Sequence, residues 1–487
     1  MPRWSWDLGV YVPQRVKPWF RWILFWKRLS GPALFLLSFI ALIAIGTVVL
    51  TLMPGMEIGK PLSILDATFT VASAVTVTGL VVTDTATHFT PLGQAWLLVC
   101  MQLGGIGLIT VTTMLIGALG KRLSLRSEML GMLPTRRTDR PEVWQVAWGV
   151  AKFSLAIEAV GAVLLFLLWL PRFDVGNAAW HALFHAISAY CNAGFTTFSG
   201  GLGGFHDAPL TLIVLSILVI LGGLGYLTFE ELIRWWHSAK ARRTGARIRF
   251  QGTRRLSSHT FAVVVTSVSL LVVGWILFAI FEWHDTLGGM AIVDKLTNAW
   301  FMSVMPRSGG FNTVDYAQIG NDSATLTMLL MFVGGSPGSM AGGIKTTTVA
   351  VIVALGLSRL RGQRFVGIKD RAIPQDTIER TIGVVLLFGF VALVSFFTLG
   401  AIEGAGQAAA ETRGLFLPIA FETLSAFTTT GLTMTTTADL AAPSKVMLML
   451  LMFIGRVGLF SFFTALILRR AQSAAYVRPA QEDVIVG

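Results

Sequence analysis

Long apolar runs with few polar interruptions dominate the chain and recur at regular intervals. Residues 33–52 (ALFLLSFIALIAIGTVVLTL) and 160–170 (VGAVLLFLLWL) are nearly free of charged side chains. A helix that crosses a bilayer needs about 20 predominantly apolar residues. The pattern predicts eight membrane-spanning helices, at approximately 31–53, 92–118, 147–170, 210–233, 260–281, 324–357, 381–400 and 444–468.

The predicted spans form four pairs, and the linker inside each pair is too apolar to be a solvated loop. Each linker contains an apolar stretch that is too short to cross the bilayer. The four stretches are ILDATFTVASAV, AAWHALFHAISAY, LTNAWFMSV and LPIAFETLSAF. Non-helical backbone at membrane depth is tolerated only where it is buried in protein or lines a watery cavity. We therefore expect four re-entrant pore helices.

A five-residue segment with Gly fourth and Leu or Phe fifth follows each short stretch. The segments are TVTGL (76–80), CNAGF (191–195), RSGGF (307–311) and TTTGL (428–432). A second landmark follows in the second span of each pair: GGIG from Gly104, GGLG from Gly222, GGSPG from Gly334 and GRVG from Gly455. The fourfold recurrence predicts an all-α polytopic membrane protein, built from helix–pore-helix–helix repeats around a pseudo-fourfold pore.

The predicted repeats divide the chain into consecutive domains. Repeats one to four occupy residues 31–120, 145–235, 258–357 and 381–470. A basic, Trp-rich segment at 1–30 suits the inner membrane surface. Residues 471–487 form a predicted cytoplasmic tail.

Charge is scarce, and its placement supports a membrane topology. Charged residues make up 13% of the chain, whereas soluble domains carry about 25%. The net charge of +12 comes from clusters in every second loop, as the positive-inside rule predicts for cytoplasmic loops. Both termini are therefore expected in the cytoplasm. These basic loops offer sites for anionic lipid or an acidic partner, and no nucleic-acid partner is expected.

The repeated glycines predict an ion filter at the common axis. Glycine lets the backbone turn its carbonyls inward, and a ring of carbonyls can replace the hydration shell of a monovalent cation. A plainer alternative is that Gly and Thr only pack helices closely, but four copies in register favour a filter. The predicted filter residues are Thr76, Val77, Thr78, Gly79, Cys191, Asn192, Ala193, Gly194, Arg307, Ser308, Gly309, Gly310, Thr428, Thr429, Thr430 and Gly431.

The sixth apolar segment, 324–357, is too long for one span and contains GGSPGSMAGG. Such a run cannot remain helical, so a broken helix beneath the filter is predicted. Lys345 and Arg456 lie within apolar stretches, where charges are usually functional. A cation there would raise a barrier to cation flow and could bind the carbonyls of the loop. The alternative is that Arg456 packs against an acid such as Glu158 or Glu230.

Several of these motifs resemble a known family. VTGL, NAGF, GFNTVD (310–315) and GGSPGSMAGGIKTTT (334–348) resemble the superfamily of bacterial Ktr and Trk, plant HKT and fungal Trk potassium transporters. The resemblance covers about residues 31–470 and is strongest to the membrane subunit of the Ktr type. Bacterial Trk subunits carry two extra N-terminal spans, whereas one span precedes the first short stretch here.

The resemblance implies K⁺ uptake across the bacterial cytoplasmic membrane by a homodimer with one pore per subunit. It also implies regulation by a cytosolic octameric ring of nucleotide-binding RCK subunits. No organic cofactor is expected in this chain, and Na⁺ dependence of uptake stays open. Glycine at all four filter positions goes with K⁺ in the superfamily, although Gly309 and Cys191 depart from its usual pattern.

The resemblance further assigns the broken helix as the gate. The loop at 334–345 would obstruct the cytoplasmic half of the pore. The predicted gate residues are Gly334, Gly335, Ser336, Pro337, Gly338, Gly342, Gly343, Lys345 and Arg456.

Two rival functions stay open at this point. One is a Na⁺ or ammonium conduit of the same architecture. The other is a polytopic membrane enzyme using Glu158, His181 and His185, but these lack a nucleophile and base at suitable spacing and leave the repeated glycine unexplained. His181 and His185 lie one helical turn apart, which also suits a metal pair, yet no third ligand is nearby in the sequence.

Overall fold

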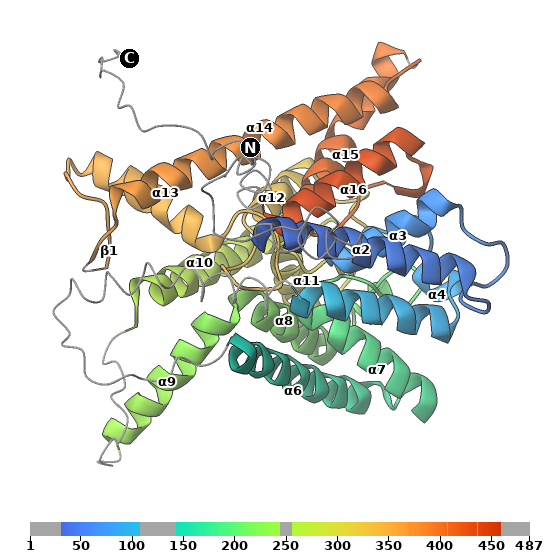
Figure 1. Cartoon of the computed structure of the whole chain (residues 1–487), viewed down its shortest axis with the longest axis horizontal. Helices are drawn as coiled ribbons and strands as arrows, with labels where there is room; N and C mark the ends of the chain where they lie inside the picture. Colours follow the sequence, from blue (N-terminus) through green and yellow to red (C-terminus); the bar gives the residue numbers. More distant parts are fainter. Residues whose placement is uncertain are drawn as a thin grey trace, which may run out of the picture.

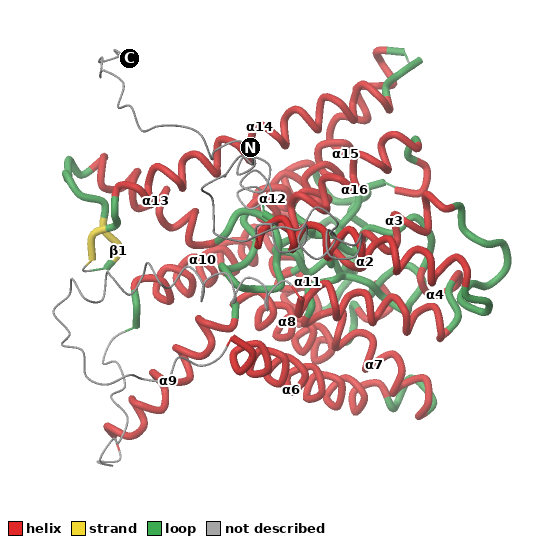
Figure 2. The backbone as a smooth tube through the Cα atoms, in the orientation of Figure 1, coloured by secondary structure: helices red, strands yellow, loops and turns green. Residues whose placement is uncertain are grey.

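The computed structural model describes residues 31–107, 143–243 and 256–458, apart from Asp370, Gln407 and Thr436. The predicted segments 1–30 and 471–487 and the basic loop at 121–140 lie outside these ranges. The described chain consists mainly of α-helices joined by loops (Figures 1 and 2). Its strands, β1 (Gly367–Ile368) and β2 (Arg371–Ala372), form one small antiparallel hairpin.

The order long helix, short helix, second helix recurs four times along the chain. The long helices are α2 (Gly31–Leu52), α6 (Val143–Trp169), α10 (Ser258–Phe281) and α14 (Gln375–Glu403). The short helices are α3 (Ile64–Thr76), α7 (Val175–Tyr190), α11 (Ile292–Val304) and α15 (Ala409–Phe427). The second helices are 91–107, α8 (Pro209–Leu224), α12 (Asn321–Phe332) and α16 (Ala442–Val457).

The remaining elements are connections between or continuations of these helices. They are α4 (Thr85–His88), η1 (Gly203–Phe205), α9 (Tyr226–Arg243), α13 (Thr346–Leu360) and η2 (Thr437–Asp439). The short helices converge on the middle of the molecule, where loops gather in Figure 2.

Three described helices are long and apolar enough to cross a membrane. They are Trp148–Trp169 of α6, α10 and α14, and the bent pair α8–α9 is a fourth if it is counted as one span. The predicted spans 92–118 and 444–468 extend beyond the described residues. The described part of the chain therefore contains fewer full-length spans than the eight expected from the sequence.

The predicted continuous span at 210–233 is wrong. Helix α8 ends at Leu224, and α9 leaves it at an angle of 102°. Gly225 lies between them with a φ of +78°, which ends a right-handed helix. The hydroxyl of Ser336 donates to the carbonyl of Leu224, so a loop from another repeat takes the acceptor that the next helical turn would have used.

The apolar segment 324–357 is likewise not one helix. Helix α12 ends at Phe332 and α13 begins at Thr346. The intervening segment, 333–345, is here called the axial loop. Its two ends are paired, because Gly334 N donates to Ile344 O and Ile344 N donates to Phe332 O. The loop therefore leaves and re-enters the helical layer at nearly the same place.

Glycine residues allow the second helices to pack against the backbone at the C-terminal ends of the short helices. A Cβ atom added to Gly104 would lie less than 3.0 Å from Val75 O. The same holds for Gly222 with Tyr190 O and for Gly455 with Phe427 O. Each of the three contacted residues, Val75, Tyr190 and Phe427, immediately precedes one of the five-residue segments. The second landmark of the sequence thus has a packing role in repeats one, two and four.

Repeats one and four also meet through charge, which closes the circle of repeats. Lys445 Nζ of α16 lies 2.9 Å from Asp66 Oδ1 of α3. The two residues are 379 positions apart in the sequence, and both are partly shielded from solvent. Figure 1 shows α3 and α16, blue and red, side by side.

We expect Gly455→Ala to destabilise the protein, because the added methyl group would collide with the rigid backbone at Phe427 O. Such overpacking costs about 1–3 kcal/mol. The change should lower the melting temperature of the purified protein in detergent. Gly389→Ala in α14 is the matched control, since no atom lies within 4 Å of its added Cβ. Equal melting temperatures for the two variants would contradict this packing role.

Candidate functional site

The four five-residue segments share an unusual backbone conformation; their first four residues are here called turns 1 to 4. The second residue of each turn has a positive φ: 55° at Val77, 60° at Asn192, 66° at Ser308 and 51° at Thr429. Only one other non-glycine residue in the described ranges, Lys369, shares this property. Positive φ is strained for β-branched residues such as valine and threonine, and such strain clusters at functional sites.

The glycine in fourth place also has a positive φ in every turn, between 70° and 94°. The third residue does not, so residues of positive φ and of negative φ alternate. Each turn therefore can present a row of carbonyl oxygens in one direction.

The four turns touch one another in a closed ring. A Cβ atom added to any of the four glycines would lie less than 3.0 Å from the next turn. The nearest atoms are Ala193 O for Gly79, Gly310 Cα for Gly194, Thr430 O for Gly310 and Thr78 O for Gly431. Turn 1 thus meets turn 2, turn 2 meets turn 3, turn 3 meets turn 4, and turn 4 returns to turn 1. No side chain fits at these contacts.

Turns 1 and 4 are held in the same way by serine and threonine hydroxyls. Gly79 N donates to Ser73 Oγ over 3.0 Å, and Gly431 N donates to Ser425 Oγ over 3.1 Å. The hydroxyls of Thr76 and Thr78 lie 2.8 Å apart, as do those of Thr428 and Thr430. These threonine side chains are therefore occupied with each other, which leaves the backbone as the free polar surface.

Turns 2 and 3 depart from this arrangement. In turn 2, Ser188 Oγ donates to Phe195 O over 2.7 Å. The side-chain amide of Asn192 has no hydrogen-bond partner among the described residues. In turn 3, the side chain of Arg307 extends away from the ring and donates to Ser267 and to Gly334 O. Arg307 therefore does not contribute its side chain to the ring, although the sequence analysis grouped it with the filter.

A cavity of about 650 Å³ opens onto one end of the ring. All four turn glycines line it. Asp84 and Asp315 also line it, and its described lining contains no Lys, Arg or His. A recess with acidic residues and no basic ones concentrates cations. We call this cavity the vestibule.

The axial loop covers the opposite end of the ring. Gly342 N donates to Ser308 Oγ over 3.2 Å, and a Cβ atom at Gly342 would collide with Thr429 Oγ1. Ser308 and Thr429 are second in their turns, whereas the vestibule meets the fourth residues. The vestibule and the axial loop are therefore on opposite sides of the ring.

Backbone hydrogen bonds fix the axial loop to the second helix of repeat two. Ser336 N donates to Gly223 O over 2.9 Å, and Met340 N donates to Gly222 O over 3.0 Å. These carbonyls are available because α8 ends at this point. The bend at Gly225 and the axial loop thus depend on each other.

Three cations, of which Arg456 is buried and the other two are partly buried, bind carbonyls in or beside the axial loop. Arg456, 3% exposed, donates to Met340 O and, over 3.3 Å, to Gly104 O. Lys345 Nζ donates to Ala341 O over 2.7 Å, and Arg307 donates to Gly334 O over 3.1 Å. The sequence did not lead us to expect that Arg307 binds the axial loop. The signal for it is that turn 3 begins with an arginine, whereas the other turns begin with Thr or Cys.

The alternative that Arg456 packs against an acid does not fit this geometry. Glu158 accepts from Gln102 Nε2 over 2.7 Å, and Glu230 pairs with Arg234. None of the ion pairs within the described ranges includes Arg456. Arg456 instead ties repeats four and one to the axial loop.

The residues considered for an enzyme do not form a catalytic group. His181 bonds to Thr197 over 2.7 Å, and His185 bonds to Thr196 over 2.9 Å. Each imidazole thus holds the chain that follows turn 2, while Glu158 bonds to Gln102. The described residues contain no cluster of three or more His, Cys, Asp or Glu side chains suited to a metal ion.

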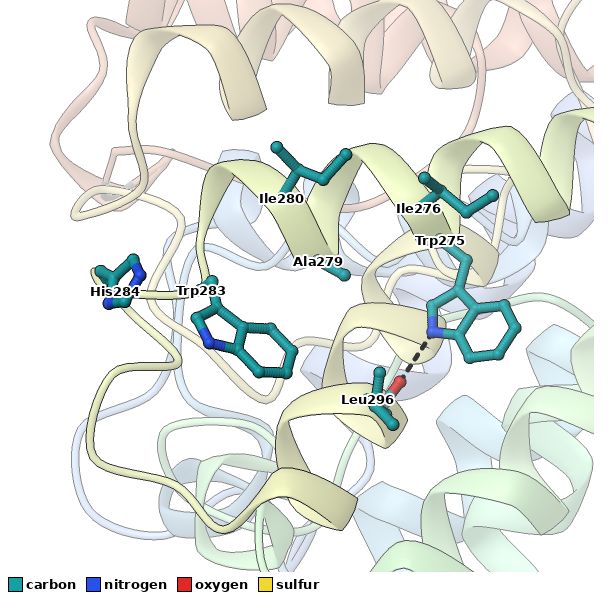
Figure 3. Close-up of a pocket in the computed structure, with 7 residues that line it drawn as sticks. All are labelled: Trp275, Ile276, Ala279, Ile280, Trp283, His284 and Leu296. Atoms are coloured by element: carbon teal, nitrogen blue, oxygen red, sulfur yellow. Dashed lines mark hydrogen bonds between the residues drawn. The ribbon is translucent and has the colours of Figure 1, made fainter.

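A second cavity, of about 530 Å³, lies between α10 and α11, away from the turns (Figure 3). Its lining is apolar apart from the indoles and the imidazole of His284, and Trp275 Nε1 donates to Leu296 O over 2.9 Å. Ile276 and Ile280 are about half exposed or more. Such a surface suits lipid chains rather than an ion, so the candidate site is the ring.

Comparisons with known proteins identify the family of this chain. The family model for TrkH, described as "Cation transport protein", matches residues 35–476. The Ktr system potassium uptake protein B of Bacillus subtilis (strain 168) is 34% identical over 446 residues, covering 90% of this chain and 94% of that protein. The potassium/sodium uptake protein NtpJ of Enterococcus hirae is 30% identical, covering 95% and 98%.

A solved structure shares the fold. The crystal structure of the potassium transporter TrkH from Vibrio parahaemolyticus superposes with a TM-score of 0.68 at 19% sequence identity, covering 91% of this chain and 86% of that one. The family resemblance drawn from the motifs is thereby confirmed. The chain belongs to the TrkH family of cation transport proteins, which are membrane transporters and not enzymes.

Proposed function

We propose that this chain takes up K⁺ across the bacterial cytoplasmic membrane, through the ring formed by turns 1 to 4. The ring of four touching glycines, with an acidic vestibule at one end, is the observation that carries the proposal. The names of the relatives, which refer to potassium uptake, support it. A ring of backbone oxygens replaces the water around a dehydrated K⁺ ion.

The filter in this proposal consists of the sixteen residues of turns 1 to 4. Their backbone oxygens are the ion ligands. The short helices end at the ring, and their C-terminal ends carry partial negative charge that favours a cation. The side chain of Arg307 has no part in coordination, because it is engaged with Ser267 and Gly334.

The axial loop acts as the gate in this proposal, with residues 334–345 between the filter and the cytoplasm. Its support is the contact of Gly342 with turns 3 and 4. Arg456 and Lys345 hold the loop through its carbonyls, and their charges oppose the passage of a cation. Opening then requires the loop to leave the ring.

The assembly proposed with this function is a homodimer with one pore per subunit. A cytosolic octameric ring of nucleotide-binding RCK subunits would regulate it, and both termini would face the cytoplasm with the basic loops near anionic lipid. A Na⁺ conduit is the second candidate, because the name of NtpJ refers to potassium and sodium. The same name supports the proposal that uptake depends on Na⁺. An ammonium conduit stays an alternative outcome of the transport test.

Rubidium uptake tests the proposed function. The chain, expressed in cells that lack their own K⁺ uptake systems, should restore growth at low K⁺ and accumulate labelled Rb⁺. Excess K⁺ should compete strongly, and Na⁺ or ammonium weakly. A correctly inserted protein that supports no Rb⁺ uptake would overturn the proposal, and competition by Na⁺ or ammonium as strong as by K⁺ would favour the alternatives.

We expect Gly79→Ser to weaken discrimination against Na⁺. The new side chain would meet Ala193 O and sit on a backbone with a φ of +94°, so one quarter of the ring must distort. The ratio of K⁺ to Na⁺ flux should fall about tenfold, which corresponds to about 1.4 kcal/mol. Gly59→Ser is the matched control, because Gly59 has a φ of +80° with open space around it. An unchanged flux ratio in Gly79→Ser would argue against the filter.

We expect Arg456→Gln to raise K⁺ flux in the absence of the regulatory subunits, because one charge and one anchor of the axial loop are removed. A barrier lowered by about 1.4 kcal/mol would increase flux about tenfold. Arg456→Lys keeps the charge but cannot match the two carbonyl contacts, so its flux should lie between the other two. A flux in Arg456→Gln at or below that of the unmodified protein would exclude the gate role.

A further inference from the structure

Helix α9 projects from the helix bundle and has two chemically different faces (Figure 1). One face is apolar, with the spacing i, i+3, i+4, i+7 of an amphipathic helix, and consists of Phe229, Leu232, Ile233 and Trp236. A second face is polar and consists of Glu230, Arg234 and His237. Trp236 is 56% exposed and Ile233 is 40% exposed, so the described chain leaves much of the apolar face uncovered.

The first turns of α9 lie at the depth where a membrane-crossing helix begins. Phe229 packs on Phe153 of α6, with 4.5 Å between the ring centroids. Phe153 comes five residues after Trp148, the start of the part of α6 that is long and apolar enough to cross a membrane. At a rise of about 1.5 Å per residue, this is about 7.5 Å from the end of that part. Interfacial helices bury their apolar face about 5–10 Å into the boundary of headgroups and acyl chains, which agrees with this depth.

The bend at Gly225 directs α9 along the membrane surface. Helix α8 contains no charged residue, as expected of a segment inside the membrane, and α9 leaves it at 102°. Such an angle changes the direction of the chain from across the membrane to along its surface. Trp and Lys side chains are typical of this position, and Lys240 Nζ lies 5.6 Å from the ring centroid of Trp236. The angle, the depth and the side chains of α9 therefore all suit an interfacial helix.

We propose that α9 lies at the inner membrane surface and binds anionic lipid. The binding face consists of Phe229, Leu232, Ile233, Trp236 and Lys240. A basic segment beside a membrane is attracted to anionic headgroups, and residues 240–255 include seven basic residues and no acidic residue. An acidic protein would match this charge, but the depth of Phe229 places the apolar face against lipid. The assignment to the inner leaflet rests on the proposed topology.

The junction of α8 and α9 also supports the axial loop. A Cβ atom added to Gly225 would lie less than 3.0 Å from Ser336 Oγ and from Pro337 O. The carbonyls of Gly222 and Gly223, in the last turn of α8, accept from backbone amides of the loop. Lipid bound to α9 holds its angle to α8 and so keeps these contacts in place. Anionic lipid therefore favours the position of the loop against the ring; this effect on transport rests on the proposed function, whereas the membrane contact does not.

Spin labels on introduced cysteines test the membrane contact without requiring transport. The native cysteines, Cys100 and Cys191, are buried, and the unmodified protein reports any label that they take up. Trp236→Cys and Arg234→Cys are compared because residues two positions apart point to nearly opposite sides of a helix. In nanodiscs of phosphatidylcholine and phosphatidylglycerol, the Trp236→Cys label should collide mainly with oxygen, which concentrates in lipid. The Arg234→Cys label should collide mainly with a water-soluble nickel chelate.

Three results would overturn the proposal. The first is equal access of the nickel chelate to both labels, because α9 would then lie in water. The second is a Trp236→Cys label that is shielded from the chelate only after a cytosolic regulatory subunit is added, because the face would then bind protein. The third concerns the charge of the lipid: in discs of phosphatidylcholine alone, oxygen collisions of the Trp236→Cys label should fall about twofold, and an unchanged value would exclude a preference for anionic lipid.

A transport measurement tests the effect on the axial loop. In proteoliposomes that contain phosphatidylglycerol and no regulatory subunit, Trp236→Glu should take up Rb⁺ about fivefold faster than the unmodified protein, because a charge on the apolar face weakens the membrane contact. Arg234→Gln is the matched control, since it changes the charge of α9 by the same amount on the polar face and should leave the rate unchanged. Equal rates in the two variants would overturn the link to the loop.

The two measurements also separate this inference from the proposed function. Labels that differ as expected, in a protein that takes up no Rb⁺, would overturn the proposed function and leave the membrane contact of α9 intact. Rb⁺ uptake by a protein whose two labels are equally open to the nickel chelate would do the reverse.

Discussion

The four turns can meet only because the residue at each contact lacks a side chain. Every added Cβ atom at these glycines would collide with the neighbouring turn, mostly with backbone. Backbone cannot move aside as a flexible side chain can, so the ring diameter is set by main-chain contacts. A dimension fixed in this way is suited to discrimination between ions by their size and hydration. The second helices pack against the ends of the short helices at Gly104, Gly222 and Gly455, again through backbone contacts that leave no room for a side chain.

On the side of the ring that faces the axial loop, charged side chains are hydrogen-bonded to backbone carbonyls. Arg456, Lys345 and Arg307 are bonded to carbonyls, and none of them forms an ion pair with another described residue. A charge away from water needs such partners. Because the carbonyls belong largely to the axial loop, the loop position and the burial of these cations are energetically linked.

The repeats are alike in backbone but not in side chains. Turns 1 and 4 use the same serine and threonine bonds. Beside turn 2, Ser188 and His185 bond to the chain that follows the turn, and turn 3 directs an arginine toward the axial loop. Among the described residues, the axial loop interrupts the second helix of repeat three, and buried glutamates lie beside turn 4 (Glu422) and beside turn 2 (Glu158, which accepts from Cys191). The backbone ring is thus close to fourfold, while the surrounding side chains differ from repeat to repeat, and the axial loop contacts turns 3 and 4 alone.

The sequence by itself determined the features that recur. The family, the helical membrane class, the short helices and the turn glycines followed from four copies of one pattern, because a pattern that repeats in register is rarely accidental. The break at 333–345 followed from a Gly-rich run that cannot be helical. The tertiary structure decided what depends on contacts between distant residues. The bend at Gly225 requires Ser336 from another repeat, and the direction of the Arg307 side chain is set by Ser267 and Gly334. The buried Glu422 of α15 accepts from the hydroxyl of Thr435 because the chain turns back on its own short helix after turn 4, and no local spacing records such a contact.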